Sequence, residues 1–197
     1  KKWLDYEKIS YLVAYETRSG KDYPHIYVDK EEGIREGVRH LIEHGHKKIA
    51  YVAGKSNLTP DILPKSGYVK AFQEMGWNLR DEWIWSEEDM TDLPAKIART
   101  GVTGIFFRRD ISALRAMGRL AEAGIDVGKD ISIIGYGNMD ECTHSYPTLT
   151  SIDPHIERAG REAVGLCIQE DIARMGCPYL KLVPDIMFRQ SCGCEEE

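Results

Sequence analysis

The chain has 197 residues, of which 42% are hydrophobic, and its formal net charge at pH 7 is −6. This length allows one good hydrophobic core or two small lobes, and the composition indicates neither disorder nor a repeat array. No apolar run approaches the roughly 18 residues that a membrane-spanning helix needs, so we expect no membrane partner. The acidic balance argues against this part of the protein holding DNA, which requires clusters of Lys and Arg.

Strand-like runs alternate with segments of helical spacing along most of the chain. The expected strands are residues 9–15, 25–28, 48–53, 83–85, 104–107, 131–134 and 149–152. The expected helices are residues 33–45, 66–76, 93–99, 112–123 and 155–173. Four strand–helix alternations predict parallel strands joined by right-handed crossovers, and therefore an α/β fold with a doubly wound parallel sheet. The late segment 180–188 is strand-like, and Pro184 limits it to an edge strand or a bulge.

The first long helix has the clearest periodicity. Ile34, Val38, Leu41 and Ile42 recur at helical spacing, with charged residues on the other face. Gly45 is a typical residue for the end of this helix. We expect the apolar face to pack on the sheet.

Three turns follow strands and should therefore lie on the same edge of the sheet. They are residues 54–65, 108–110 and 135–138. Ligands of open α/β sheets bind outside the carboxyl ends of the strands. We therefore expect a small-molecule cleft at this edge, and the alternative is three ordinary loops.

Five cysteines, an odd number, argue against a secreted disulfide framework. Reduced thiols in a cytoplasmic protein are the simpler interpretation. Cys192 and Cys194 could instead bind a soft metal or form a strained disulfide, but zinc needs four ligands. His40 and His44 have a spacing that can bind metal, yet no third ligand is evident, and capping or surface roles are favoured. We predict no metal ligand and no cofactor.

Four stretches form a pattern through their order and spacing. They are residues 40–50 (HLIEHGHKKIA), 67–72 (GYVKAF), 123–136 (AGIDVGKDISIIGY) and 147–152 (PTLTSI). Together they resemble the effector-binding domain of the LacI/GalR family of bacterial transcription regulators. The resemblance implies a non-enzymatic sensing domain, with no catalytic residues, that binds a small-molecule effector.

The same resemblance implies a type I periplasmic-binding-protein-like fold, in which three crossover strands link two lobes. Residues 29–151 with 181–197 would form the carboxyl-side lobe, and residues 1–28 with 153–178 part of the amino-side lobe. Much of the first lobe and the DNA-binding headpiece would be missing, so DNA would be bound only through that absent headpiece. The helix at 155–173 would then have an uncovered apolar face, which predicts a homodimer or a rearrangement of residues 1–28.

The ending RQSCGC at residues 189–194 is similar to that of sensor domains that precede signalling modules. Diguanylate cyclases and histidine kinases are examples of such modules. The alternative function is therefore the sensing domain of a bacterial signalling protein.

The resemblance places candidate ligand-binding residues at Pro64, Arg109, Asp110, Gly137 and Asn138. Sugar-binding members have Arg, Asn and Asp where this chain has Pro64, Arg109 and Gly137. These replacements make a typical sugar doubtful, because each unpaired buried polar group costs about 1–3 kcal/mol.

The planar guanidinium of Arg109 suits a carboxylate or phosphate, so an anionic effector stays open. In the alternative interpretation, Arg109 pairs with Asp110 or with the acidic segment 87–89 of the chain itself.

Overall fold

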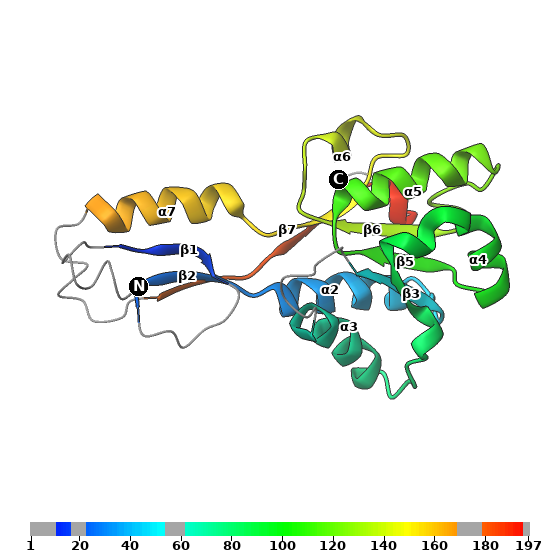
Figure 1. Cartoon of the computed structure of the whole chain (residues 1–197), viewed down its shortest axis with the longest axis horizontal. Helices are drawn as coiled ribbons and strands as arrows, with labels where there is room; N and C mark the ends of the chain where they lie inside the picture. Colours follow the sequence, from blue (N-terminus) through cyan, green and yellow to red (C-terminus); the bar gives the residue numbers. More distant parts are fainter. Residues whose placement is uncertain (1–10, 17–22, 54–61, 169–178, 195–197) are drawn as a thin grey trace. The chain divides into compact units, whose positions relative to one another are not determined.

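The computed structural model describes residues 11–16, 23–53, 62–168 and 179–194 (Figure 1). The chain divides into two compact units. Unit 1 comprises Lys1–Lys30 and Pro154–Pro184, and unit 2 comprises Glu31–Asp153 and Asp185–Glu197. The chain therefore passes between the units three times.

Unit 2 is built on a six-stranded sheet with the order β4-β3-β5-β6-β7-β9. The strands are β3 (Ile49–Ala53), β4 (Ile84–Ser86), β5 (Gly104–Phe107), β6 (Ser132–Tyr136), β7 (Thr150–Asp153) and β9 (Asp185–Met187). All neighbours pair in parallel except β7 and β9, which are antiparallel. The predicted α/β class with a mainly parallel sheet is confirmed.

Helices connect these strands. The α-helices of unit 2 are α2 (Lys30–Glu43, whose first residue belongs to unit 1), α3 (Ile62–Glu74), α4 (Leu93–Thr100), α5 (Asp110–Glu122) and α6 (Glu141–His144). The 3-10 turns are η1 (Asp81–Trp83), η2 (Glu87–Asp92) and η3 (Gln190–Cys192). The loop expected at residues 55–65 is wrong in its last part, because α3 already begins at Ile62.

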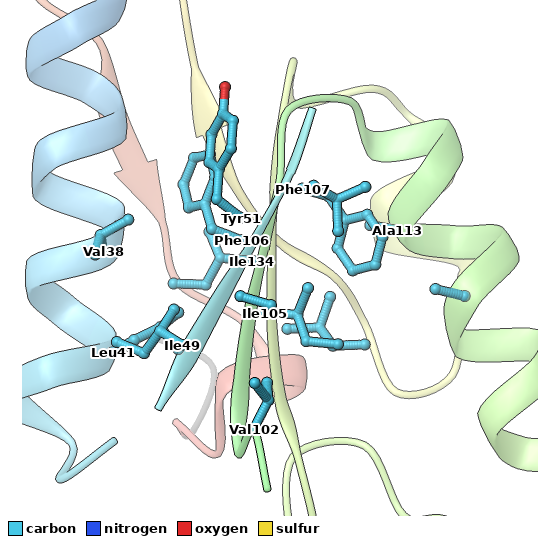
Figure 2. Packing of buried hydrophobic residues seen from close by; sticks show 14 of the residues in the cluster. Val38, Leu41, Ile49, Tyr51, Val102, Ile105, Phe106, Phe107, Ala113 and Ile134 are labelled. Carbon is cyan, nitrogen blue, oxygen red and sulfur yellow. The ribbon is translucent and has the colours of Figure 1, made fainter. Parts of the chain in front are cut away.

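Helices cover both faces of the central strands. Figure 2 shows Val38 and Leu41 of α2 on one side of the strands and Ala113 of α5 on the other. The predicted inward face of α2 is confirmed, since Ile34, Val38, Leu41 and Ile42 are all buried. Gly45 follows α2 with a φ of 89°, a left-handed conformation that suits glycine.

An aromatic stack fills the α2 side of the core. The Tyr51 ring lies 5.4 Å from that of Tyr68 and 6.1 Å from that of Phe106, between ring centroids. The buried Tyr68 hydroxyl donates to the carbonyl oxygen of Ile49 at 2.8 Å. Gly37 allows this packing, because a Cβ there would lie 2.6 Å from the Phe106 ring.

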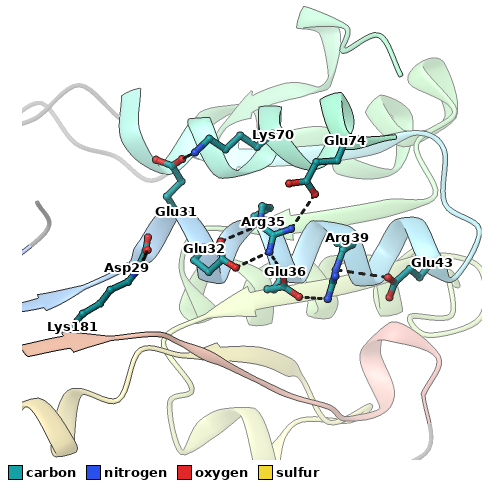
Figure 3. A network of polar contacts seen from close by, with 10 residues as sticks. All are labelled: Asp29, Glu31, Glu32, Arg35, Glu36, Arg39, Glu43, Lys70, Glu74 and Lys181. Carbon is teal, nitrogen blue, oxygen red and sulfur yellow. Dashed lines mark hydrogen bonds and ion pairs between the residues drawn. The ribbon is translucent and has the colours of Figure 1, made fainter. Parts of the chain in front are cut away.

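The exposed side of α2 carries ion pairs that reach α3 (Figure 3). Arg35 pairs with Glu32 of its own helix at 2.6 Å and with Glu74 of α3 at 2.9 Å. Lys70 of α3 pairs with Glu31. Exposed pairs of this kind contribute up to about 1 kcal/mol each, so the buried face of α2 dominates its stability.

Unit 1 contains a parallel sheet of three strands, in the order β1 (Val13–Glu16), β2 (His25–Val28) and β8 (Tyr179–Leu182). The helix α7 (Ile156–Ile168) buries Ala159 in a small core with Ile26, Val28 and Leu182. The apolar residues Ile156, Val164 and Ile168 of α7 remain 56%, 59% and 74% exposed. The sheet therefore covers only part of the apolar surface of α7.

The strand-like segment around Pro184 belongs to both sheets. β8 ends at Leu182 and β9 begins at Asp185, and each is the edge strand of its own sheet. The predicted edge position is confirmed, but the segment forms two strands, because proline lacks the N–H that a continuous ladder requires. Within the described residues, no helix has the length and apolar character required to cross a membrane.

Candidate ligand-binding site

The strands β4, β5, β6 and β7 run in parallel, so they end at one edge of the sheet of unit 2. The residues at or just beyond these ends include Glu87, Arg109, Asn138 and Asp153. This is the carboxyl edge, where open α/β sheets bind ligands.

Arg109 lies between β5 and α5 and pairs with the acidic segment that follows β4. Its Nε donates to Oε1 of Glu87 at 2.9 Å, and its Nη2 contacts the same oxygen. The Ser112 hydroxyl donates to this oxygen as well. The Arg109 side chain is 45% exposed, whereas that of Glu87 is only 13% exposed. The edge thus presents a guanidinium whose charge is balanced by the chain itself.

Asp110 is 1% exposed, and its carboxylate faces its own chain. Oδ1 accepts a hydrogen bond from the Ser151 hydroxyl at 2.7 Å, and Oδ2 accepts one from the N–H of Met139 at 3.0 Å. Glycines make room for it, since a Cβ on Gly135 would lie 2.1 Å from Oδ1 and one on Gly137 3.1 Å from Oδ2. Asp110 therefore ties the end of β5 to β7 and to the turn after β6.

Cys142 of α6 lies beside this carboxylate. Burial, together with the charge of Asp110 and a hydrogen bond to it, raises the pKa of the Cys142 thiol to about 12. The thiol is therefore protonated at neutral pH and is a weak nucleophile.

Asn138 adopts a φ of 50°, a conformation that Asn tolerates better than most residues. Its N–H donates to the Ser151 hydroxyl oxygen at 3.0 Å, and its Nδ2 donates to Oδ2 of Asp153 at 3.2 Å. Its Oδ1 accepts from Nη2 of Arg189 at 2.8 Å, and Nη1 of Arg189 donates to the carbonyl of Leu149 at 2.7 Å. The Asn138 amide is thus held in one orientation.

The structure brings three of the five sequence-predicted residues together: Asp110, Gly137 and Asn138. Arg109 lies at the end of the same strand as Asp110 and pairs with Glu87. Pro64 lies in α3, and its side chain is outside the described residues. The roles of all five in binding stay predictions.

Sequence reasoning missed Ser151 and Arg189, which hold Asp110 and Asn138 in place. Arg189 reaches the edge only because β9 returns antiparallel beside β7, and no local pattern indicates that pairing.

A cavity of about 450 Å³ lies elsewhere in unit 2. It is lined by the end of α5, the turn at Gly124–Lys129 and the tail residues Gln190, Gly193 and Cys194. None of the predicted ligand-binding residues lines it. We therefore place the candidate effector site at the carboxyl edge, where the charged and amide groups converge.

A second cluster of reactive side chains lies at the C-terminal half of α2. Single ligand atoms of His40, Cys192 and Cys194 lie within 4.8 Å of one another, and Nε2 of His44 lies 3.4 Å from Sγ of Cys194. Burial, together with the charges of His44 and His46, lowers the pKa of His40 to about 4. The sequence interpretation found no third ligand for these histidines, whereas the fold places two thiols beside them.

An α/β unit with a mainly parallel sheet and polar groups at its carboxyl edge defines a ligand-binding domain rather than a DNA-binding one. Residues 38–192 match the family model of the periplasmic binding protein-like domain, and the chain belongs to this family.

Its relatives are transcription regulators. The HTH-type transcriptional repressor PurR of Pasteurella multocida is 32% identical over 182 residues, which cover 87% of this chain and 54% of the repressor. The chain thus spans about half the length of this relative.

Solved structures show the same fold. A regulatory protein of the LacI family from Chloroflexus aggregans has a TM-score of 0.83 and 23% identity, over 96% of this chain and 71% of that one. A LacI family regulator from Enterococcus faecium with bound ribose has a TM-score of 0.78 and 23% identity, over 95% of this chain and 72% of that one. The predicted LacI-type effector-binding domain is confirmed.

Proposed function

We propose that the whole protein is a bacterial transcription regulator, that this chain senses its small-molecule effector without converting it, and that a separate segment binds DNA. The PurR relative supports this proposal. The chain matches about half of that protein, which is named an HTH-type transcriptional repressor after its type of DNA-binding segment. A regulator of this kind works in the cytoplasm. Units 1 and 2 correspond in this proposal to the two lobes of the family fold.

The geometry of the carboxyl edge favours a neutral, hydroxyl-rich effector over an anion. Arg109 already pairs with Glu87, so an anionic ligand would have to replace that carboxylate. An Arg–Glu pair instead offers a hydroxyl group both a donor and an acceptor, which is what a polyol or sugar needs. The pairing of Arg109 with Glu87 is the observation that carries this conclusion. The ribose bound by the Enterococcus faecium regulator is compatible with it.

In this proposal Asp110 and Ser151 position the edge, and Arg109, Glu87 and Asn138 contact the effector. Asp110 is 1% exposed and both of its oxygens accept hydrogen bonds from the chain itself, which supports a positioning role rather than contact with the effector.

We further propose that the chain acts as a homodimer. Ile156, Val164 and Ile168 expose apolar surface on α7, and a second copy could cover it. The effector can shift the arrangement of such a dimer only by its differential affinity for the two states. Analytical ultracentrifugation tests this, and Val164→Glu should shift the chain to a monomer.

A thermal-shift screen tests the effector proposal. The 197-residue chain is heated with neutral sugars and polyols, sugar phosphates, nucleosides and small carboxylates. An effector at 100 times its dissociation constant should stabilise the chain by about 2.7 kcal/mol. Neutral hydroxyl-rich compounds should raise the melting temperature, and Arg109→Ala and Glu87→Ala should abolish the rise.

Arg115→Ala serves as a matched control, because Arg115 is an exposed arginine of the same helix α5. Hits confined to anions, lost with Arg109→Ala but kept with Glu87→Ala, would restore the anionic interpretation. No shift with any compound would refute sensing by this chain.

Gel retardation by the full-length protein separates a transcription regulator from a signalling protein, whose sensing domain the ending RQSCGC resembles.

A further inference from the structure

His40 of α2 and His44, the residue that follows α2, both lie beside Cys194. His40 and His44 are one helical turn apart, and their ring centroids lie 4.1 Å from each other. Nε2 of His40 lies 3.3 Å from Sγ of Cys194, and Nε2 of His44 lies 3.4 Å from the same sulfur. Residues about 150 positions apart in the sequence thus meet.

The protonation of His44 follows from its other ring nitrogen. Nδ1 of His44 lies 3.0 Å from the backbone carbonyl oxygen of His40, which can only accept, so Nδ1 carries the hydrogen. Nε2 therefore presents a lone pair to Cys194. A histidine that donates its second N–H to a backbone carbonyl is the usual orientation of a metal ligand.

One thiol proton cannot satisfy both histidines. Cys194 has a single S–H that can donate to the Nε2 of His44, so without a metal ion His40 must carry its hydrogen on Nε2 and donate to the sulfur. A cation among the two nitrogens and the sulfur would accept all three lone pairs.

A second thiol completes the set. Sγ of Cys192, which is 2% exposed, lies within 4.8 Å of the ligand atoms of His40 and Cys194. The Thr150 hydroxyl oxygen lies 3.1 Å from this sulfur. Two nitrogen and two sulfur ligands are a preferred set for a structural zinc site.

The backbone between the two cysteines is constrained to this geometry. Gly193 has a φ of 81°, and a Cβ on it would lie 3.0 Å from the carbonyl oxygen of Gly128. A Cβ on Gly128 would in turn lie 2.5 Å from the carbonyl oxygen of Gln190. The tail is therefore packed closely against the turn after α5, and this packing holds Cys192 and Cys194 beside α2.

We propose that His40, His44, Cys192 and Cys194 bind one Zn²⁺ ion, which ties the tail after β9 to α2. In tetrahedral zinc sites with Zn–S of about 2.3 Å and Zn–N of about 2.0 Å, sulfur and nitrogen ligands lie about 3.5 Å apart. The two sulfur–nitrogen distances to Cys194 are close to this value. Cys192 and His44 must approach each other on binding, because only the ligand atoms of His40, Cys192 and Cys194 all lie within 4.8 Å of one another. Binding forms two Zn–S and two Zn–N bonds and releases the two thiol protons to solvent.

This site is separate from the effector edge. The end of α2 lies just before the start of β3. The backbone carbonyl oxygen of Cys192 accepts a hydrogen bond from the hydroxyl of Ser132, at the start of β6. Both lie at the amino ends of the strands, opposite the carboxyl edge. Cys194 also lines the 450 Å³ cavity, through which an ion can reach the ligands.

Metal counting tests the proposal on the full chain. The chain is purified with a non-thiol reductant, incubated with excess Zn²⁺, desalted, and assayed for zinc by mass spectrometry. We expect one zinc per chain, and a native mass increased by one zinc less two protons. Substitution with Co²⁺ should produce the intense visible bands of a tetrahedral ion and the charge-transfer bands of thiolate ligands.

Cys194→Ser and His44→Gln should abolish both signals, and neither residue is deeply buried, so both variants should fold. Cys167→Ser and His144→Gln remove an exposed cysteine and an exposed histidine outside the cluster, and they should keep both signals. Folding of each variant is checked by circular dichroism. A folded wild-type chain without retained zinc, weak octahedral Co²⁺ bands, or zinc retained by Cys194→Ser would each overturn the proposal. Because no effector enters this assay, its result is independent of the sensing function.

Discussion

Asp110→Ala tests whether the buried carboxylate holds the carboxyl edge together. The substitution removes the acceptors of the Ser151 hydroxyl and the Met139 N–H, which bond to Asp110 at 2.7 and 3.0 Å. A buried donor without a partner costs about 1–3 kcal/mol. Two such donors, together with the loss of an acidic residue from the first turn of α5, should lower the free energy of unfolding by about 3–5 kcal/mol. This loss is a large part of the free energy of unfolding of a typical domain, which is roughly 5–15 kcal/mol.

Two further variants calibrate the effect. Asp110→Asn keeps the shape but turns an amide N–H₂ towards one donor, so the expected loss is about 1–3 kcal/mol. Glu122→Ala alters an exposed residue of the same helix and should change the free energy of unfolding by less than about 0.5 kcal/mol.

Urea unfolding followed by tryptophan fluorescence is the suitable assay. Trp77, Trp83 and Trp85 lie in unit 2 with Asp110, and Trp83 and Trp85 are buried, so the signal reports mainly on that unit. A free energy of unfolding for Asp110→Ala within about 0.5 kcal/mol of the wild-type value would refute the reasoning. The carboxylate would then be available to a ligand.

Other substitutions test the packing and the reactivity that the structure shows. Gly67→Ala should destabilise unit 2 by about 1–3 kcal/mol, because the new Cβ would lie 2.2 Å from the carbonyl oxygen of Glu31 and would push α3 away from α2. An unchanged midpoint of urea unfolding would contradict this contact. Gly118→Ala should instead stabilise the chain by about 0.5–1 kcal/mol, since nothing lies within 4 Å of its Cβ position in α5. At pH 8, iodoacetamide should alkylate Cys142 at least about 100-fold more slowly than the exposed Cys167, because the thiolate is the nucleophile and the pKa of Cys142 is raised to about 12. Peptide mass spectrometry measures both rates. Equal rates would show that the Cys142 thiol is accessible and ionised.

Local pattern predicted the secondary structure of unit 2 well. The inward face of α2 and the limits of β5 at Gly104–Phe107 follow from hydrophobic spacing, which depends on residues only a few positions apart. The start of α3 was misplaced because a segment rich in Ser, Asn, Thr and Pro appeared to be a loop throughout.

The sequence by itself determined the α/β class of the fold, the position of the carboxyl edge and the family of the chain. The alternation of strands with helices and the spacing of the motifs can be read directly from the sequence. The tertiary structure alone decided which polar groups at that edge are exposed and which are buried against the protein. Asp110 is satisfied by Ser151, 41 residues away, and Asn138 by Arg189, 51 residues away. Cys194 meets His40 across 154 residues. The contacts of Arg189 and Cys194 depend on the antiparallel return of β9 beside β7. A hydrogen bond or a ligand set between residues so far apart in the chain produces no periodic pattern in the sequence.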